Sequence, residues 1–474
     1  MSGYARIDAA FMEGLKAAIG EKNMITDREK MSDYAHDEYS QEDIRHYPDV
    51  VVKPSSTEQV SGVVKLCHEK RIPLTPRGGA TGLCGGSVPV FGGVVLSLEN
   101  MSRVEEIDTK NLTATVEAGL TLMDFYRALE SSGLFFPPHP GDETATLGGV
   151  IATNAGGARA IKYGVIRNFV KGIEAVFADG HAEWIGGKYI KNSSGYSLLN
   201  LLIGSEGTLC VITKAVITLM PLPAVMITLV APFPALADAI ATVPAILQAG
   251  VTPMAVEFLE REPILLSESH LNRQWPVKGG EAHLMIIVDG TNEEEALGQA
   301  EKIAEVCTAN GAIDVFIADS KQKQENVLSI RSQIYEALKP HVLEVLDVTV
   351  PRADIAAFVG DIQTVGREEG MWIPTYGHAA DGNVHNHLMR DCWKEGQWTE
   401  IPGWKEKYPK VRQRIHDLGR KYRGMVSGEH GIGFIKKEYL ASFIGKTQIG
   451  FMRGIKKVFD PLNILNPGKI FDPE

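Results

Sequence analysis

The sequence predicts an α+β protein with two domains rather than a regular doubly wound sheet. The chain has 474 residues, which is too long for one ordinary core at roughly 150 residues per domain. Before Pro221, short apolar runs and amphipathic stretches alternate irregularly, and after it they form two β-α-β units. Two such units side by side predict a ferredoxin-like second domain.

The first half opens with a strand, a helix and a second strand that ends at a glycine loop. The apolar run Val50–Lys53 favours a strand, and Ser55-Ser56-Thr57-Glu58 is a capping signal for a helix that continues to Lys70. The second strand is Pro73–Pro76. The other elements predicted in this half are strands at Val94–Leu98, Val104–Ile107, Thr113–Glu117, Ile173–Ala178 and Val211–Leu219 and a helix at Leu122–Ser132.

The second half carries the two β-α-β units, followed by further helical periodicity. In chain order, the elements of the two units are Val225–Ala231, Ala235–Gly250 and Met254–Leu259, then His283–Asp289, Glu293–Asn310 and Asp314–Ile317. Later helices are predicted at Gln324–Leu338, Ile355–Glu369, Lys410–Tyr422 and Gln448–Asp460.

Composition argues against several classes of protein. The net charge of −11 disfavours a nucleic-acid partner, which requires a basic face. Prolines divide the apolar stretch Met220–Glu257, so no run reaches the ~20 residues of a membrane-spanning helix. The five cysteines form no C-x-x-C pair and the N-terminus has no signal-peptide pattern, so we expect reduced thiols in a cytoplasmic protein.

Two histidine-containing segments near the C-terminus are candidates for a metal site. In Gly377–His385, two histidines flank an Asp-Gly-Asn turn, and His387 follows. In Ser427–Gly433, a glutamate and a histidine lie between glycines. A single histidine is more often an ordinary core or loop residue. Two neutral imidazoles and a carboxylate, however, suit a divalent metal with open coordination positions.

A glycine-rich loop follows the strand at Pro73–Pro76. Its residues Arg77-Gly78-Gly79-Ala80-Thr81-Gly82 offer successive backbone amides without bulky side chains, as loops that cradle phosphate do. The loop fits neither the Gly-x-Gly-x-x-Gly pattern of Rossmann domains nor the P-loop pattern of ATPases. Taken alone, it is equally well explained as a structural turn.

Four segments occur in an order that resembles the FAD domain of the vanillyl-alcohol oxidase superfamily. They are Thr75–Val88, His139–Glu143, Leu147–Gly157 and Gly204–Thr208. With the two histidine segments and the tail Asn466–Lys469, the chain is similar to the FAD-linked D-2-hydroxy-acid dehydrogenases. These include D-lactate dehydrogenases, the large flavoprotein subunit of glycolate oxidase and D-2-hydroxyglutarate dehydrogenases.

The resemblance implies a domain organisation. Residues 1–220 would form a two-subdomain FAD-binding domain of the vanillyl-alcohol oxidase type. Residues 221–424 would form the ferredoxin-like cap, or substrate domain, with the metal motif, and residues 425–474 would return to the FAD domain.

The resemblance also implies which residues bind FAD. The pyrophosphate would be wrapped by Pro76, Arg77, Gly78, Gly79, Ala80, Thr81, Gly82 and Leu83. The flavin and ribityl chain would be lined by Pro140, Gly141, Thr146, Gly149, Asn154 and Gly157, the adenosine half would be approached by Glu206 and Gly207, and the C-terminal residue returning to the flavin would be Asn466. The pyrophosphate loop lacks the histidine that links FAD covalently in some members, so we expect non-covalent FAD.

For the metal and the base, the resemblance implies four residues. His378, His385 and Glu429 would be ligands of Zn²⁺, Fe²⁺ or Mn²⁺. His430 would be the general base, because a metal lowers the pKa of a bound hydroxyl and an imidazole, with an ordinary pKa of about 6.5, can take its proton. The alternative is that His430 only orients a metal ligand.

Three further positions bear on the substrate. Arg331 matches the arginine that binds the substrate carboxylate, with a surface salt bridge as the alternative role. His387 would face the substrate near the metal. The hydroxyglutarate branch has a threonine and a lysine where this chain has Tyr335 and Val345. Tyrosine and valine supply no positive charge to pair with a second substrate carboxylate. We therefore favour a short monocarboxylate, D-lactate before glycolate.

The sequence contains no second recognisable redox centre. Electrons would therefore pass from FADH₂ to a separate acceptor, namely an electron-transferring flavoprotein, an iron–sulfur subunit, a quinone or oxygen. A homodimer is a further expectation. Two other classes stay open, which are a metallohydrolase that uses the histidine–glutamate set and a non-catalytic FAD subunit of a larger oxidase.

Overall fold

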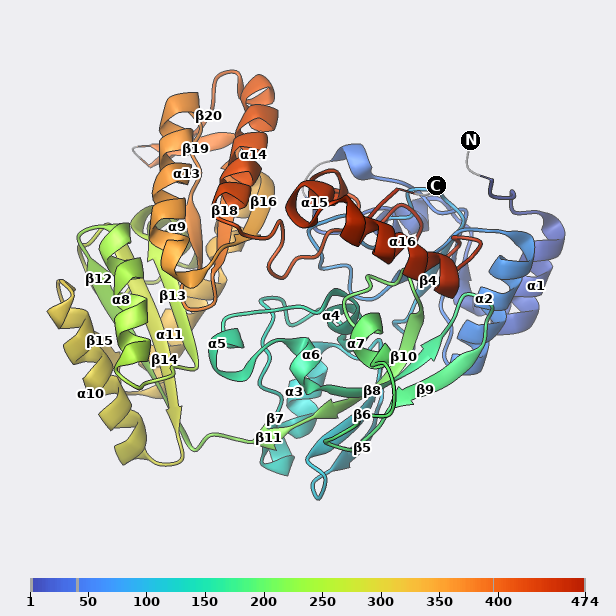
Figure 1. Cartoon of the computed structure of the whole chain (residues 1–474), viewed down its shortest axis with the longest axis horizontal. Coiled ribbons are helices and arrows are strands. Elements are labelled where there is room, and N and C mark those ends of the chain that lie inside the picture. Colours follow the sequence, from blue (N-terminus) through green and yellow to red (C-terminus); the bar gives the residue numbers. More distant parts are fainter. Residues whose placement is uncertain (1–2, 40–41, 395, 473–474) are drawn as a thin grey trace. The chain divides into compact units, whose positions relative to one another are not determined.

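The computed structural model describes residues 3–39, 42–394 and 396–472, and the chain forms two compact units (Figure 1). The first unit consists of Met1–Gly156, Val165–Leu222 and Glu429–Glu474, and the second of Gly157–Gly164 and Pro223–Gly428. The breaks after Leu222 and Gly428 lie close to the expected ones. Residues Gly157–Gly164, in contrast, group with the second unit, whereas the sequence interpretation placed them in the first.

Two sheets form the frame of the first unit. One has the order β1 (Met24–Ile25), β2 (Val50–Val52), β4 (Val94–Ser97) and β3 (Leu74–Arg77), with β2, β3 and β4 parallel. The other is antiparallel, with the order β5 (Val104–Asp108), β6 (Thr113–Glu117), β10 (Val211–Thr218), β8 (Val170–Val176) and β9 (Ala182–Gly186). A separate pair is formed by β7 (Leu134–Phe135) and β11 (Met220–Pro221).

Helix α2 (Thr57–Lys70) shows how the sequence sets the elements of this unit. The Ser56 hydroxyl caps it by accepting a hydrogen bond from the N–H of Gln59, at the predicted capping signal. Its buried residues, Val60, Val64 and Cys67 among them, follow helical spacing. The remaining helices are α1 (Ala9–Ile19), α3 (Leu122–Leu129), α4 (Leu147–Thr153), α6 (Ile166–Phe169), α7 (Leu198–Leu202), α15 (Lys437–Ile444) and α16 (Lys446–Phe459).

One antiparallel sheet forms the frame of the second unit. Its order is β15 (Phe316–Ala318), β12 (Val225–Phe233), β14 (Ala282–Gly290), β13 (Ala255–Glu260), β17 (Thr375–His378), β18 (Asn383–Met389) and β16 (Val342–Thr349). The first four strands, with α8 (Leu236–Gln248) and α10 (Glu293–Ala309), are the predicted ferredoxin-like motif. The last three strands extend it and were not predicted, because β17 is short and β18 contains asparagines, which are depleted in strands.

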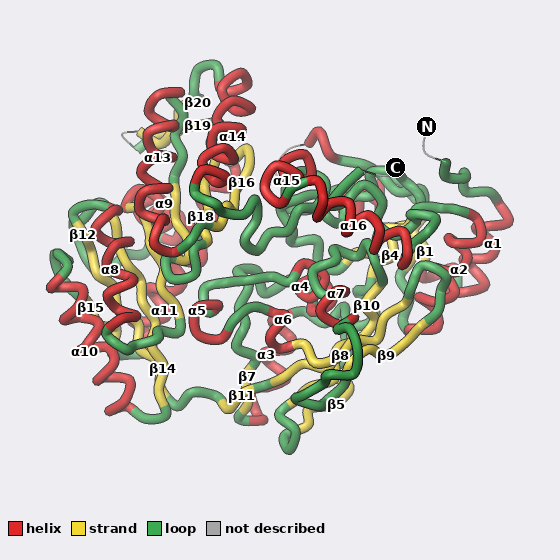
Figure 2. The backbone as a smooth tube through the Cα atoms, viewed as in Figure 1, coloured by secondary structure: helices red, strands yellow, loops and turns green. Residues whose placement is uncertain are grey.

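Helices pack on this sheet in two groups, drawn red in Figure 2. In the first group, α8 packs against α10 and against α13 (Ile355–Glu369), which in turn packs against α14 (Trp404–Lys421). In the second, α9 (Arg261–Leu271) packs against α11 (Lys321–Ser332) and α12 (Ile334–Leu338). The single helix predicted at Gln324–Leu338 is thus two helices. A separate hairpin is formed by β19 (Asp391–Lys394) and β20 (Gln397–Glu400).

The segment Gly157–Gly164 is fixed to the second unit by Asp289 on β14. The buried Asp289 carboxylate accepts hydrogen bonds from Nζ of Lys162 and from the hydroxyl of Tyr163, each at 2.5 Å. The short helix in this segment, α5 (Ala160–Tyr163), also contacts β13. Because a buried carboxylate requires such partners, these bonds explain why the segment belongs to this unit.

Among the described residues, no helix has both the length and the apolar composition that crossing a bilayer requires.

Candidate active site

The glycine loop after β3, residues 77–88 and called the phosphate loop below, has the backbone features of an anion-binding nest. In the described part of the chain, the amides of residues 79–83 donate no hydrogen bond. Ala80 has a left-handed backbone, with φ of 56°, which residues other than glycine adopt rarely and at some cost. Amides that the protein does not use, placed around a left-handed residue, are what a phosphate-binding nest offers. The loop therefore fits an FAD pyrophosphate.

The segment around α4 lies against this loop. A Cβ atom on Gly78 would lie 2.2 Å from Oγ1 of Thr146, so only glycine permits this approach. Thr146 caps α4 by accepting a hydrogen bond from the N–H of Gly149 at 3.3 Å, and Asn154 ends the helix with φ of 50°. The predicted flavin-lining residues Thr146, Gly149 and Asn154 therefore lie in or at the ends of a short helix that packs against the phosphate loop.

The other predicted flavin-lining residues have different surroundings. Pro140 and Gly141 lie in the irregular segment that precedes α4. Gly157 begins the segment that belongs to the second unit. Their contact with FAD stays a prediction.

The side chain of Arg77 holds the phosphate loop to the N-terminal segment. Its guanidinium donates hydrogen bonds to the carbonyl oxygens of His36 at 2.7 Å and Asp33 at 2.5 Å. Burial lowers the pKa of the guanidinium, although nearby acidic groups, Asp37 first, oppose this. We therefore expect Arg77 to serve FAD by fixing the loop.

Glu206 also uses its side chain within the protein. Its carboxylate accepts hydrogen bonds from the N–H groups of Ile432 at 2.8 Å and Gly433 at 2.7 Å. Burial raises the pKa of this carboxyl group, and the two amides counteract the rise. The side-chain amide of Asn466 donates to the carbonyl oxygen of Glu206 at 2.7 Å. The loop that carries Glu206 and Gly207 is thus bonded directly to Asn466 within the first unit.

The predicted histidine ligands lie on the hairpin of β17 and β18. In the register of the sheet, His378 lies opposite Glu257 of β13, and His385 lies opposite Tyr376. Because side chains alternate along a strand, His378, His385 and His387 project from the same face of the sheet.

The loop that leads to Glu429 is anchored in the second unit by Asp347 on β16. The N–H of Gly428 donates to the carbonyl oxygen of Asp347 at 2.9 Å and to its carboxylate at 3.1 Å. The hydroxyl of Ser427 donates to the same carboxylate at 3.1 Å. Because Glu429 follows Gly428 directly in the chain, these bonds determine where Glu429 lies.

The structure brings the predicted metal ligands together. The ligand atoms of His378, His385 and Glu429 all lie within 4.8 Å of one another, with both histidines buried. Two imidazoles and one carboxylate at this spacing fit Zn²⁺, Fe²⁺ or Mn²⁺ and leave coordination positions for a substrate. His430 follows, with Nε2 at 4.0 Å from Oε1 of Glu429.

Glu257, which the sequence interpretation did not select, links two predicted site residues. One carboxylate oxygen accepts a hydrogen bond from Nδ1 of His378, and the other accepts from Nε of Arg331 at 2.9 Å and from its Nη2. An Nδ1–H group bound to a carboxylate leaves Nε2 to face a metal. Burial raises the pKa of Glu257, but the charges of His378 and Arg331 outweigh it and lower the pKa to about 2. An isolated acid in the apolar run Met254–Leu259 is the sequence signal for this residue.

Arg331 lies in the last turn of α11 with its side chain 19% exposed. Its guanidinium lies 4.9 Å from the centre of the Tyr376 ring. Its partner is thus a buried carboxylate beside the metal ligands, and not an exposed surface acid.

His387 lies among the residues that bear on substrate size. It is fully buried, its Nδ1 pairs with the carbonyl oxygen of Pro374 at 3.1 Å, and its ring stacks on Tyr376 at 4.6 Å. The ring of Tyr335 lies 6.2 Å away, and Val345 is its partner across the sheet. His387, Tyr335 and Val345, the residues that bear on substrate size, therefore lie close together.

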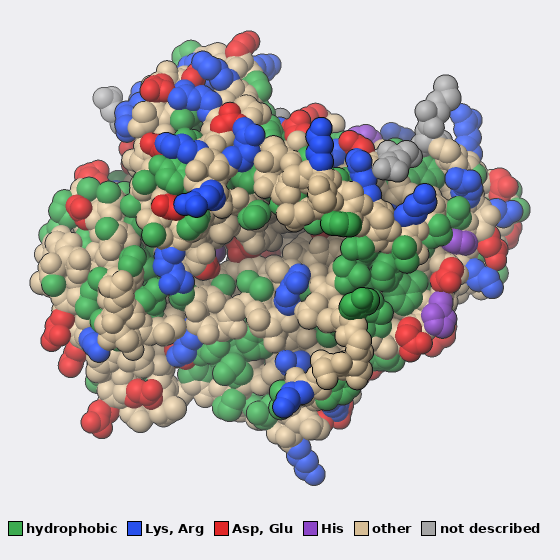
Figure 3. Space-filling view, viewed as in Figure 1, with side chains coloured by type: hydrophobic (Ala, Val, Ile, Leu, Met, Phe, Trp, Pro, Cys, Tyr) green, Lys and Arg blue, Asp and Glu red, His purple; other side chains and the backbone are tan. Residues whose placement is uncertain are grey.

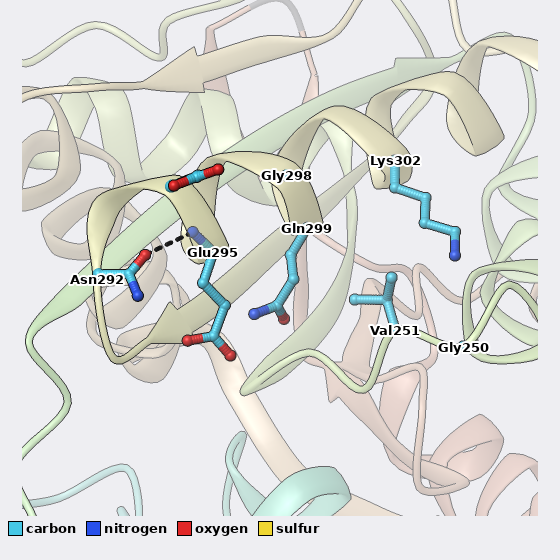
Figure 4. A pocket seen from close by; sticks show the side chains of 8 residues that line it. Gly250, Val251, Asn292, Glu295, Gly298, Gln299 and Lys302 are labelled. Carbon is cyan, nitrogen blue, oxygen red and sulfur yellow. Dashed lines mark hydrogen bonds between the residues drawn. The ribbon is translucent and has the colours of Figure 1, made fainter.

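A hollow elsewhere in the second unit has no comparable chemistry. It has a volume of about 540 Å³ and lies beside the first turns of α10 (Figure 4). There the side chain of Asn292 caps α10 by accepting a hydrogen bond from the N–H of Glu295 at 2.9 Å. Neither histidine nor arginine lines it, and the lining residues are Gly250, Val251, Asn292, Glu294, Glu295, Gly298, Gln299 and Lys302.

A phosphate-binding loop, together with a metal-type donor set backed by a carboxylate and an arginine, defines a flavin-dependent oxidoreductase. Similarity to known protein families supports the same class. Residues 48–186 match the FAD binding domain family, and residues 222–470 match the family of FAD linked oxidases, C-terminal domain. The chain belongs to this family of FAD-linked oxidases.

Individual proteins extend the similarity over most of the chain. A D-lactate dehydrogenase of Archaeoglobus fulgidus is 46% identical, over 89% of this chain and 91% of its own length. The glycolate oxidase subunit GlcD of Bacillus subtilis is 38% identical, over 90% and 89%. The solved structure of p-cresol methylhydroxylase with substrate bound matches 98% of this chain and 96% of its own with a TM-score of 0.80 at 18% identity. That likeness confirms the predicted vanillyl-alcohol oxidase fold.

Proposed function

We propose that this chain oxidises a small D-2-hydroxy acid to the 2-oxo acid, with D-lactate as the favoured substrate. The observation that carries the proposal is the connection from Arg331 through Glu257 to His378, beside the histidine–glutamate donor set. This connection places the guanidinium of Arg331, which can bind a carboxylate, beside a metal-type site that can activate a hydroxyl. An α-hydroxy acid carries a carboxylate and a hydroxyl on adjacent carbons. The similarity to a D-lactate dehydrogenase and a glycolate oxidase subunit supports this class.

The chain's own residues have distinct roles in this reaction. When bound, FAD accepts the hydride from C2 and the metal lowers the pKa of the substrate hydroxyl. Arg331 binds the substrate carboxylate, since a guanidinium has five N–H donors and can serve Glu257 at the same time. His430 takes the hydroxyl proton on its imidazole. The metal is held by His378, His385 and Glu429.

The surroundings of His387 support a short substrate. Tyr335 and Val345 offer no positive charge, and a second carboxylate left unpaired beside them would be costly to bury. D-Lactate is therefore favoured, with glycolate next. Lys339, whose Nζ lies 6.0 Å from the centre of the Tyr335 ring, is the observation in favour of D-2-hydroxyglutarate as the second candidate.

We expect D-lactate to bleach the flavin. Under anaerobic conditions, protein loaded with metal and FAD should lose its visible flavin absorbance after D-lactate is added, because the hydride reaches FAD and nothing removes it. L-Lactate is the control and should leave the spectrum unchanged. Glycolate and D-2-hydroxyglutarate should reduce the flavin more slowly than D-lactate. If none of these acids reduces it, the chain is better explained as a non-catalytic FAD subunit.

We expect acid precipitation to release all of the FAD. The phosphate loop contains no histidine, and its one thiol, Cys84, donates to the carbonyl oxygen of Gly431 at 3.4 Å. The flavin absorbance should therefore appear in the supernatant, quantitatively against the amount loaded. A pellet that stays yellow would contradict non-covalent binding.

The electron acceptor is proposed to be a separate protein, an electron-transferring flavoprotein or an iron–sulfur subunit. Across the ranges that the structure describes, His378, His385 and Glu429 form the only clustered set of potential metal ligands. On the face drawn in Figure 3, acidic and basic side chains are interspersed, so this face favours neither sign of partner charge. None of the five cysteines, all of which lie in the described ranges, is in a disulfide, in keeping with the proposed cytoplasmic location.

A further inference from the structure

The C-terminal segment is bonded to both glycine loops of the first unit. Near the start of the segment, the N–H of Phe434 donates to the carbonyl oxygen of Cys84 in the phosphate loop at 2.8 Å. The N–H groups of Ile432 and Gly433 donate to the carboxylate of Glu206 in the other loop. The two loops, far apart in the sequence, are thus attached to the same short stretch of chain.

Asn466 bridges the same two loops near the end of the chain. Its side-chain Nδ2 donates to the carbonyl oxygen of Gly86 at 2.9 Å and to that of Glu206 at 2.7 Å. Its backbone N–H donates to Leu74 of β3 at 2.7 Å. The backbone is left-handed, with φ of 41°, which asparagine tolerates better than most residues. One amide group therefore connects the phosphate loop to the loop that carries Glu206.

Lys469 adds a third contact in the same turn. Its side chain is 2% exposed, and its Nζ donates to the carbonyl oxygen of Val88 at 2.7 Å. Burial lowers the pKa of this amine to about 7, and the carboxylates of Asp37 and Glu206 only partly oppose the shift. A buried amine destabilises the fold that contains it, so a purely apolar side chain would serve stability better here.

These contacts hold the phosphate loop by its carbonyl groups. The bound carbonyl groups of Cys84, Gly86 and Val88 directly follow the amides of residues 79–83, so these bonds fix the end of the loop on which those amides depend. A loop that is already ordered loses less conformational entropy when its ligand binds. We infer that the turn Asn466–Lys469 sets the affinity of the chain for FAD, and that Lys469 is a positioning residue for the phosphate loop.

The test is a titration of FAD-free, full-length protein with FAD, followed by flavin fluorescence. Lys469→Met keeps a long side chain but removes the donor, and should raise the Kd for FAD by roughly 10- to 100-fold. Asn466→Ala removes both bridging bonds and should raise it by a similar factor. Lys469→Arg keeps a donor and should raise it less. The control is Leu15→Ala, which creates a cavity at a buried position of α1.

The melting temperatures of the FAD-free proteins separate positioning from general stability. A merely structural role predicts that every variant weakens FAD binding in proportion to its loss of melting temperature. The proposal requires Lys469→Met to weaken binding well beyond Leu15→Ala at an equal or smaller loss of melting temperature. A Kd no higher than that of Leu15→Ala would overturn it. Because the readout is cofactor binding, the result does not depend on which hydroxy acid is the substrate.

Discussion

Replacing Glu257 with glutamine should remove most of the bound metal and most of the activity. The Glu257 carboxylate accepts hydrogen bonds from His378 and from Arg331 at once, and an amide can neither hold the Nδ1–H of His378 as strongly nor offset the charge of Arg331. Loss of a carboxylate that orients a histidine ligand lowers metal affinity or activity by roughly 10- to 100-fold. Removing one partner of a buried ion pair also destabilises a protein by about 3–5 kcal/mol.

Glu260→Gln is the matched control on the same strand. The Glu260 carboxylate accepts hydrogen bonds from the N–H of Thr375 at 2.9 Å and from Nε2 of Gln363 at 2.7 Å. Burial raises the pKa of Glu260 to about 7, so an amide resembles a form that the native residue already adopts at neutral pH. We expect a much smaller loss of metal and stability than for Glu257→Gln. Metal analysis and thermal unfolding of the two variants provide the comparison.

Equal metal content in Glu257→Gln and the native protein would show that the connection does not orient a ligand. Loss of stability with full metal content would assign Glu257 to the fold alone. Loss of metal in both variants would mean that any change on this strand disturbs the hairpin.

Replacing His430 with asparagine should lower turnover by roughly 10²- to 10⁴-fold while the metal stays bound. The proposed role of the imidazole is to accept the substrate hydroxyl proton, which asparagine cannot do. Nε2 of His430 lies 4.0 Å from Oε1 of Glu429, which places the imidazole beside the donor set where the substrate hydroxyl would bind. Stopped-flow reduction of the flavin by D-lactate, with metal analysis of the same sample, measures both quantities.

Glu429→Gln provides the contrast for His430→Asn. Because Glu429 belongs to the donor set, its replacement should lower metal content and turnover together. If His430→Asn shows the same joint loss, His430 supports the metal site and is not the base. If it reduces neither quantity, another group takes the proton.

The parts of the fold with strong periodicity were predictable from the sequence. The ferredoxin-like strands and helices of the second unit and the helix at Ile355–Glu369 lie where the apolar pattern places them. The strands β17 and β18 were missed, since β17 is short and asparagine and histidine replace the β-branched and aromatic residues typical of strands in β18. The histidines of the site therefore also weaken the sequence signal of the strand that carries them.

Only some of the site residues could likewise be predicted from the sequence. The two histidines and Glu429 could be found because each lies in a short local motif. Glu257 could not be matched to His378, from which it is separated by 121 positions, because only strand pairing brings the two together. Side-chain roles in the phosphate loop were equally hidden. Arg77 and Glu206 lie in the predicted loops, but their charged groups bind main-chain atoms of distant segments.

The bonds between Asp289 and the segment Gly157–Gly164 have a consequence for exchanging parts between relatives. The second unit is built from two separate pieces of chain, and the shorter piece behaves like a tethered peptide ligand of the longer one. A chimera that takes only residues 223–428 from a donor would pair its Asp289 with a foreign peptide, or leave the carboxylate buried without Lys162 and Tyr163. Substrate preference can therefore be transplanted cleanly only when both pieces move together.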